Sequence, residues 1–392
     1  MRSVNRVSLD KFFTTLIGIL ILYFSLIELT PVLGTGFIYT MFISTIAIII
    51  FIYLLIARFD ISNVKLLIPI ALYLILFLLN LNDSPEVLLF QLLAFILFFV
   101  CSNLYWRAPN LKILHFFNIF VFIVLIGEVL FHFVVQPGTT EINLLGIANV
   151  NRVAMMSLTM SYFSIMYTIF YKKNFKKSSL IIWCSLVLLI VLLSGSRTAL
   201  ISIVAILVTI FYWKKITASK LRFNMYFISV ILIIGLITYI VPYASDIIPN
   251  FERLNMIAFD ITGKELYSGR EVLWKSAFEL ISRQPLFGYG AGAELKDFTN
   301  TTLTTHNLFL QILLQVGFIG LISFISFLLF IWQSFWKNKN NKKVIISAGY
   351  LMGIIVYQGF EVTLVLSSVW FSFILWIIIG IMTSFTKYED QT

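Results

Sequence analysis

Residues 306–336 read HNLFLQILLQVGFIGLISFISFLLFIWQSFW, a run of 31 positions without a lysine, arginine, aspartate or glutamate. An α-helix crosses a bilayer core of about 30 Å with roughly 20 apolar residues, so this run predicts a membrane span. The run is longer than one crossing needs, and we expect its first turns to project above the bilayer. Inside the bilayer no water satisfies the backbone, which leaves the helix as the expected structure.

The whole chain shares this apolar character. Of its 392 residues, 60% are hydrophobic and only 12% are charged, about half the charged fraction usual in soluble domains. A mean hydropathy of +0.98 excludes a set of water-soluble domains. We expect an all-α, polytopic bundle that forms a single integral membrane domain over residues 1–392. Its spans are expected, about twelve in all, at 13–30, 36–57, 65–82, 86–104, 112–135, 153–171, 179–194, 198–213, 223–242, 306–336, 343–360 and 364–386.

Basic residues are distributed unevenly between the two sides of these spans. With the N-terminus in the cytoplasm, 20 of the 28 lysines and arginines fall in inside segments, of which Tyr171–Lys177 is strongly basic. Cytoplasmic loops are enriched in such residues, so we expect a multi-pass protein of the cell membrane with both termini inside. Because the basic clusters are short and separated by apolar runs, they do not form the continuous stripe that binds nucleic acid.

Residues 243–305 form a long, mostly polar segment that we expect to be a large loop outside the membrane. Within it, Ser268 and Glu271 fit a helix-capping box. Apolar residues then recur at the spacing of one helix face, at Trp274, Ala277, Phe278 and Ile281. Pro285 and the glycines of Gly288–Gly292 end the pattern, and we expect a flexible turn there. The sequence therefore predicts an amphipathic helix that lies on the membrane or on other spans.

Three arginines on the outer side oppose the orientation bias and stand near helix starts. Arg197 opens the span at 198–213, Arg270 falls in the first turn of the amphipathic helix, and Arg152 precedes the span at 153–171. A helix N-terminus with a guanidinium beside it favours an anion. The alternative for each arginine is an anchor at the membrane interface. A cation in the first turn of a helix is disfavoured by the dipole, which strengthens the case for Arg270 as an anion ligand.

His306 stands at the outer start of the long apolar run, on the same side as these arginines. Its imidazole can act as a base, an acid or a phosphate donor, although a lone histidine is often structural, as we expect for His115 and His132. Thr304 or Thr305 is expected to cap the helix that follows. Glu128 and Glu361 lie near outer span ends, where an ionisable group is costly, and each is expected to pair with an arginine.

Other residues receive structural interpretations. Cys101 and Cys184 lie at or within apolar segments without metal-ligand spacing, and we expect small core residues and no metal site. Gly349 and Gly353 have the spacing of closely packed membrane helices. The residues alone thus predict an outward-facing site rich in anion donors, and they do not separate an enzyme from a transporter.

The chain resembles the O-antigen ligase/polymerase family, which includes O-antigen ligases and Wzy-type polysaccharide polymerases. The resemblance is carried, in order, by Ser196–Ala199, Gly269–Arg270 with Trp274, Pro285–Gly290, His306–Asn307 and Gly317–Gly320. It implies a GT-C-like, metal-independent glycosyltransferase that uses a polyprenyl-pyrophosphate-linked sugar as donor, without a cofactor. Arg197, Arg270 and His306 match the family's functional residues, and Arg152 is a looser match. No Asp-x-Asp motif for a metal-bound nucleotide sugar occurs in the chain.

The resemblance covers both polymerases and ligases, and we favour a polysaccharide polymerase, because the chain is biased toward Ile, Lys, Asn and Phe and shows nothing tied to lipid A. Such an enzyme transfers glycan to a lipid-linked acceptor on the outer face of the membrane. Arg197 and Arg270 would stabilise the departing pyrophosphate, and His306 would orient or deprotonate the acceptor or contact the phosphate. Arg152, Trp274, Tyr289 and Asn307 are expected to bind substrate. The alternatives are a ligase with a different acceptor, a transporter or flippase of lipid-linked oligosaccharide, and a scaffold. Expected partners are the bilayer, the lipid-linked oligosaccharide and other polysaccharide-assembly proteins.

Overall fold

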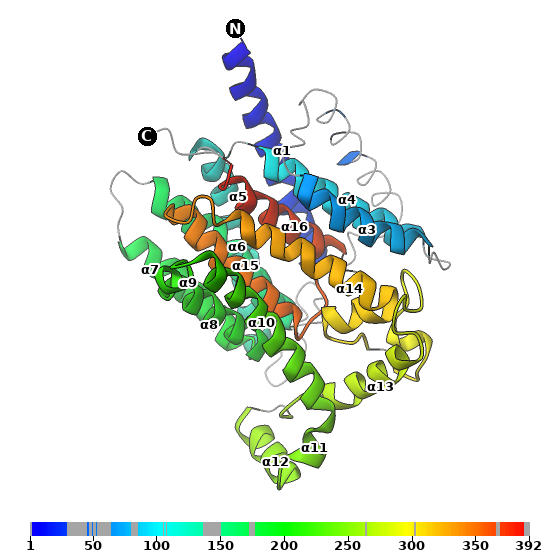
Figure 1. Cartoon of the computed structure of the whole chain (residues 1–392). Helices are drawn as coiled ribbons and strands as arrows, with labels where there is room; N and C mark the ends of the chain where they lie inside the picture. The colour runs from blue at the N-terminus through cyan, green and yellow to red at the C-terminus, as the bar shows by residue number, and fades with distance from the viewer. Residues whose placement is uncertain are drawn as a thin grey trace.

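The structure, a computed structural model, is built from helices (Figure 1). It describes residues 2–29, 45–46, 49, 52, 64–79, 85–104, 106, 108–135, 150–171, 177–262, 265–301, 303–365 and 369–387. No β-strand occurs within these ranges, which confirms the all-α fold class.

The helices follow the predicted spans closely. Their bounds are α1 (Arg2–Leu29), α3 (Val64–Leu79), α4 (Pro85–Asn103), α5 (Ala108–Val135), α6 (Val150–Tyr171), α7 (Lys177–Leu193), α8 (Arg197–Phe211), α9 (Trp213–Ile216), α10 (Lys220–Ile240), α14 (Leu308–Ser334), α15 (Lys342–Gln358) and α16 (Val369–Ser384). A helix lies at every predicted span except 36–57, which falls mostly outside the described residues. Between α10 and α14 lie η3 (Val241–Tyr243), α11 (Ala244–Ile247), α12 (Phe251–Thr262), α13 (Arg270–Arg283) and η4 (Leu295–Asp297).

Four stretches in the described part of the chain are long and apolar enough to cross a membrane. These are Asn110–Leu130, Asn151–Phe170, Lys220–Ile247 and Leu308–Ser334. Six further apolar helices have 10–17 residues each. The chain is therefore a helical membrane protein, while the number of twelve spans, the orientation and the outer position of 243–305 stay predictions.

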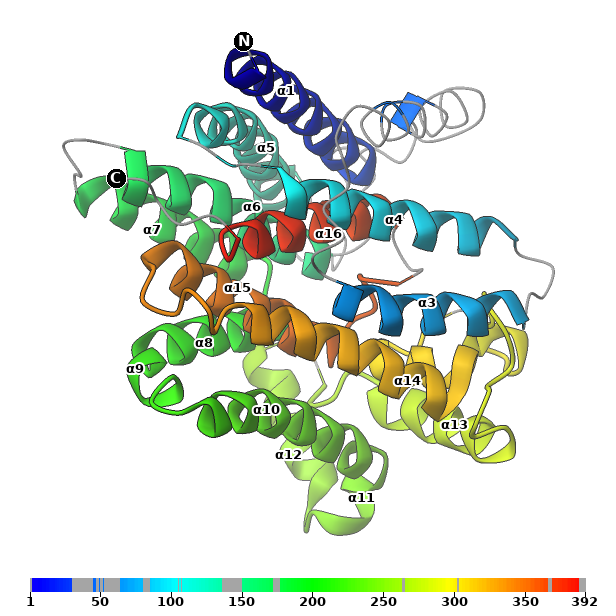
Figure 2. The same cartoon turned by 45° about the horizontal axis from the view of Figure 1, so that its top comes forward.

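The core is formed by helices that are distant in sequence. α16 packs against α4 and α1, α14 packs against α3, and α15 packs against α8; Figure 2 shows α14 beside α3 and α4 beside α16. Gly349 and Gly353 permit the contact between α15 and α8, because a Cβ at Gly353 would lie 2.6 Å from Ile206 Cγ1 and 3.1 Å from Ser202 O. The prediction of close helix packing at these glycines is confirmed.

The long apolar run predicted as a span at 306–336 forms α14, which is kinked. Gly317 interrupts the helix with φ 64° and ψ −167°, a conformation that only glycine adopts readily. The segment after α13 packs into this kink: Phe318 N donates to Pro285 O (2.8 Å), Tyr289 N to Leu314 O (2.8 Å) and Gly290 N to Gln315 O (2.9 Å). The expectation of a flexible turn at Gly288–Gly292 was wrong, since these hydrogen bonds tie its backbone to α14.

The predicted amphipathic helix is α13. Its buried face comprises Leu273, Trp274, Ala277, Leu280 and Ile281, and it packs on η3 and the start of α14 in a second apolar cluster. The sequence left open whether this helix lies on the membrane or on other helices, and the structure shows that α13 lies on other helices.

The two cysteines differ in burial. Cys101 is buried, as expected, but Cys184 is exposed on α7, so its interpretation as a core residue was wrong. The apolar run of α7 does not distinguish a protein-facing position from a lipid-facing one, because both favour apolar side chains.

Candidate functional site

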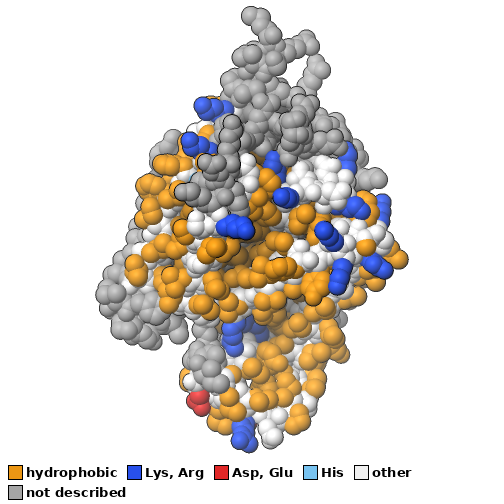
Figure 3. All heavy atoms as spheres, turned by 90° about the vertical axis from the view of Figure 1, so that its left-hand side faces the viewer, with side chains coloured by type: hydrophobic (Ala, Val, Ile, Leu, Met, Phe, Trp, Pro, Cys, Tyr) orange, Lys and Arg blue, Asp and Glu red, His pale blue; other side chains and the backbone are white. Residues whose placement is uncertain are grey.

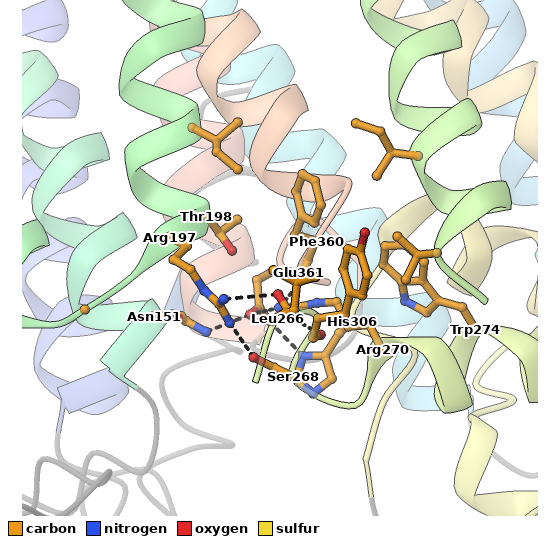
Figure 4. Close-up of a pocket in the computed structure, with 15 residues that line it drawn as sticks. Asn151, Arg197, Thr198, Leu266, Ser268, Arg270, Trp274, His306, Phe360 and Glu361 are labelled. Atoms are coloured by element: carbon orange, nitrogen blue, oxygen red, sulfur yellow. Dashed lines mark hydrogen bonds and ion pairs between the residues drawn. The ribbon is translucent and has the colours of Figure 1, made fainter. Parts of the chain in front are cut away.

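A pocket of about 440 Å³ lies where α6, α8, α10 and α13 meet two connecting segments (Figure 4). Its polar lining comes from side chains that are far apart in sequence. The lining residues are Asn151, Gly195, Arg197, Thr198, Ile201, Ile237, Val241, Leu266, Tyr267, Ser268, Arg270, Trp274, His306, Phe360 and Glu361. The pocket therefore brings together the two arginines and the histidine that the sequence singled out.

Arg197 begins α8 after a tight turn. Gly195 has φ 60°, and the Ser196 hydroxyl caps the helix by accepting from Ala199 N (3.3 Å). The guanidinium reaches across the pocket and donates to Glu265 O (2.7 Å), Leu266 O (3.0 Å) and the Ser268 hydroxyl (2.7 Å). All three acceptors are neutral, so these bonds hold the side chain in place and leave its positive charge uncompensated.

The start of α13 corrects one local prediction. Its N-cap is Gly269, with φ 76° and no side-chain hydrogen bond, so the Ser268–Glu271 capping box does not form. Ser268 itself has φ 54°, and its hydroxyl accepts from Arg197 instead. The charged guanidinium is a stronger donor to this hydroxyl than a backbone N–H would be. The contact with Arg197 therefore replaces the local cap.

Glu361 connects the polar groups of the pocket. One carboxylate oxygen accepts from Arg270 Nη2 (3.3 Å) and from Asn151 Nδ2 (3.0 Å), and the other accepts from His306 Nδ1 (3.0 Å). The Glu361 side chain is only 8% exposed. The prediction that Glu361 pairs with an arginine is confirmed. Glu361 also holds the His306 imidazole in place.

Arg270 has donors to spare. Its Nη2 also donates to Phe360 O (3.1 Å), whereas its buried Nε has no hydrogen-bond partner among the described residues. A buried donor without a partner carries a free-energy cost, and an anionic ligand that supplied oxygen atoms here would remove it.

The backbone before α14 is arranged around His306. The residue has φ 47°, and on either side Thr305 and Asn307 are fully buried. Trp274 Nε1 donates to Thr305 O (2.8 Å), so the indole fixes the segment that carries the imidazole. The cap of α14 is Asn307, whose side chain accepts from Phe309 N (2.9 Å) and Leu310 N (3.1 Å); the expected cap at Thr304 or Thr305 was wrong.

Of the residues predicted to bind substrate, one lines the pocket and three do not. Trp274 lines the pocket as part of its wall. Asn307 is fully buried and its amide donates to Thr238 Oγ1 (2.8 Å) and Gly359 O (2.9 Å), so we correct its role to a structural one. Tyr289 does not line this pocket, and its hydroxyl donates to Leu280 O (2.9 Å), so its role in binding substrate stays a prediction. Arg152 does not line the pocket.

The other titratable residues singled out from the sequence lie away from this pocket. Glu128 is buried in α5 and does not line it. His115 contacts Ser164 Oγ (2.9 Å) and stacks on Tyr167, which fits a structural role. The side chain of His132 is outside the described residues. Among described positions, no three His, Cys, Asp or Glu residues are grouped so as to hold a metal ion.

The pocket carries an excess of positive charge, with two guanidinium groups facing one carboxylate. Arg197 lies outside the predicted span at 198–213, and its pKa is lowered from the ordinary value, first by burial and then by the nearby charge of Arg270. Two cations held this close favour a ligand with negative charge on neighbouring oxygens, such as a diphosphate. A guanidinium holds its N–H donors in a fixed fork, which suits bidentate donation to such oxygen atoms.

Sequence reasoning missed several groups that hold the arginines. The carbonyls of Glu265 and Leu266 bear no side-chain signal, and Ser268 was assigned to the wrong partner. Asn151 offered a signal, since it is a polar residue beside Arg152 at a helix start, and the other candidates also stand at helix starts.

The pocket overlaps a segment that is similar to a known protein family. Residues 180–325 match the family model described as O-antigen ligase. This segment belongs to the O-antigen ligase family. The match includes Arg197, Arg270 and His306, while Asn151 and Glu361 complete the pocket from outside it. Membership supports glycan transfer of the O-antigen ligase or polymerase type by a membrane enzyme that acts on lipid-linked oligosaccharide. No curated protein matches the chain.

Proposed function

We propose that the chain is a polysaccharide polymerase that works without a metal ion on the outer face of the cell membrane. It transfers glycan from a polyprenyl-pyrophosphate-linked donor to a lipid-linked acceptor repeat unit. The observation that supports this proposal best is the convergence of Arg197, Arg270 and His306 on one pocket with an excess of positive charge (Figure 4).

The arginines act on the leaving group. When an acceptor hydroxyl attacks the anomeric carbon, the bond to the diphosphate breaks and negative charge develops on the departing oxygens. Arg197 and Arg270 are positioned before the reaction by Ser268 and Glu361. Donors fixed in this way stabilise developing charge without rearrangement, an effect of about 3–4 kcal/mol for one well-placed donor. In a reaction without a metal ion, we assign this charge stabilisation to the two arginines.

His306 is oriented to receive the proton of the acceptor. A carboxylate only accepts hydrogen bonds, so Nδ1 of a neutral imidazole carries the proton that Glu361 binds. The opposite nitrogen, Nε2, then has a free lone pair and acts as the general base on the acceptor hydroxyl. A contact between the imidazole and a phosphate oxygen is the other role that the sequence left open.

The lipid tail of the donor leaves the pocket between α8 and α10. Ile201 of α8 and Ile237 of α10 both line the pocket and are both exposed. Deeper along the same pair of helices, Thr209 Oγ1 and Tyr226 OH hydrogen bond at 2.8 Å and close the gap. This arrangement supports a donor whose diphosphate lies at the arginines and whose polyprenyl chain lies in the bilayer.

A ligase is the second candidate, because the matched family model is described as O-antigen ligase. The two activities differ in the acceptor and share the donor chemistry. A single lipid-linked repeat unit supplied alone separates them: a polymerase makes a ladder of longer glycans, and a ligase that needs a different anchor makes none.

The first prediction concerns Arg270. Purified chain in lipid nanodiscs, supplied with lipid-linked repeat units and EDTA, should extend the glycan, and Arg270→Ala should lower kcat by about 10²–10³-fold. Arg283→Ala is the matched control, because Arg283 is an exposed arginine at the other end of α13. Electrophoresis of the glycan products measures both; full activity of Arg270→Ala would refute the proposal.

A further inference from the structure

α12 presents apolar side chains that no other part of the described chain covers. It projects with α11 from one end of the helix bundle (Figure 1). Leu254 and Ile257 are 42% and 44% exposed, and Ile247 of α11 is 59% exposed. Figure 3 shows apolar side chains over the lobe at the bottom of the view, where these two helices lie. In a water-exposed helix such residues would be costly.

Exposed apolar residues occupy two faces of α12. Leu254 and Ile257 are three residues apart and therefore share one face of the helix. Met256 and Phe259, 61% and 55% exposed, are also three residues apart and share a second face. Arg253 is exposed as well and lies one helical turn from Ile257. A short helix with this much exposed apolar surface is suited to a membrane interface rather than to water.

The position of α12 indicates which surface it meets. The candidate membrane span Lys220–Ile247 ends only four residues before α12 begins at Phe251. Tyr239 and Tyr243, near the end of that span, are exposed, and tyrosines are enriched where a membrane helix reaches the headgroups. The apolar exposure thus continues from the lipid-facing side of α10 onto α12.

α12 is also connected to the pocket. Asn255 Oδ1 accepts from Leu266 N (2.6 Å), and the rings of Phe251 and Tyr267 stack at 6.0 Å. Leu266 and its neighbour Glu265 supply the two carbonyls that hold Arg197. A displacement of α12 is therefore transmitted to the Arg197 guanidinium through three consecutive residues.

We propose that α12 docks on the headgroup region of the bilayer through Leu254, Ile257 and Ile247, and that this docking fixes the Glu265–Ser268 segment that holds Arg197. The ligand of this surface is the lipid bilayer itself. Docking does not depend on the proposed function, because it concerns where α12 lies and not what the pocket transfers.

Spin labels test the docking. In nanodiscs, with the exposed Cys184 replaced by alanine and Cys101 buried, labels are placed at Leu254→Cys and Ile257→Cys. Labels at Lys214→Cys and Arg283→Cys, two exposed charged positions outside α12, serve as controls. The first pair should collide more with oxygen, which concentrates in lipid, and the control pair more with a water-soluble nickel complex. Equal nickel access for all four labels, or shielding of the first pair from both reagents by another protein copy, would overturn the docking.

Hydrogen exchange tests the connection to Arg197. The double variant Leu254→Asp/Ile257→Asp should lose protection of the Leu266 amide in nanodiscs, while Arg253→Gln/Asp260→Asn should keep it. Unchanged protection of the amides in α14 and α15 shows that both variants stay folded. Unchanged protection of Leu266 in the folded apolar-face variant would overturn the connection, whatever the transferase assay shows.

Discussion

Glu361 is the residue on which the geometry of the pocket depends. Its two carboxylate oxygens bind Arg270, Asn151 and His306, which come from three separate parts of the chain. A buried carboxylate is costly unless charged and polar partners satisfy it. We infer that Glu361 is a positioning residue: it holds the imidazole and one guanidinium, and a substrate is expected to contact those two groups.

The prediction for Glu361→Gln follows from hydrogen-bond chemistry. The amide keeps one acceptor but presents an NH₂ group to either Arg270 or His306, so two donors face each other. The kcat of glycan extension should fall by roughly 10²-fold, the lower range for losing an oriented acid–base group. Glu279→Gln, with the same change on the exposed side of α13, should leave kcat unchanged. Equal rates for the two variants would contradict this role of Glu361.

For single residues, the sequence predicted which side chains line the pocket better than it predicted their hydrogen-bond partners. Arg197 and Arg270 stood out because cations at outer helix starts oppose the orientation bias, and His306 because it lies on the same side. Glu361 stood out because an ionisable group near the end of an apolar span is costly. The helix caps at Ser268 and at Thr304 or Thr305 were predicted wrongly, because short polar side chains satisfy a local cap and a distant partner equally well. Only the fold determines which of the two is present.

Among the helices, the contact between α8 and α15 positions Arg197. Gly349 and Gly353 let the two backbones approach, and a Cβ at Gly349 would lie 2.8 Å from Ile210 Cγ1. α15 ends at Gln358, three residues before Glu361, while α8 begins at Arg197. The same helix pair thus places a positioning carboxylate and an arginine on one pocket.

We expect Gly353→Ala to destabilise the chain by about 1–3 kcal/mol, the usual cost of overpacking. Its Cβ would lie 2.6 Å from Ile206 and 3.1 Å from the Ser202 carbonyl, so α8 must shift. Gly235→Ala in α10 is the control, because nothing lies within 4 Å of its Cβ and alanine favours a helix. Unfolding in detergent measures both, and equal stability of the two variants would contradict close packing at Gly353.

Helix positions were largely predictable, and interruptions of helices were not. Apolar runs of the right length located the spans because the bilayer imposes the length. The kink at Gly317 was hidden in a continuous apolar run, since it depends on the backbone hydrogen bond that Phe318 N donates to Pro285 O and on the close approach of Leu286. Such contacts between distant segments leave no periodic signal in the sequence.

For the whole molecule, the pocket is a product of the fold. It joins residues near positions 151, 197, 268, 306 and 361, which meet only when α6, α8, α13, α14 and α15 are packed together (Figure 4). The sequence placed its candidate groups on one side of the membrane, because charge distribution across spans follows orientation. It did not predict that Glu361 would connect them.

Binding of a lipid diphosphate tests the central claim most directly. Polyprenyl diphosphate and the uncharged polyprenol are titrated against the chain in nanodiscs, for the unmodified protein, Arg197→Ala and the control Arg283→Ala. We predict tighter binding of the diphosphate, and a Kd raised at least about tenfold by Arg197→Ala but not by Arg283→Ala, as a lost charge-assisted hydrogen bond requires. Equal affinity for diphosphate and alcohol, or a Kd that Arg197→Ala leaves unchanged, would contradict the account.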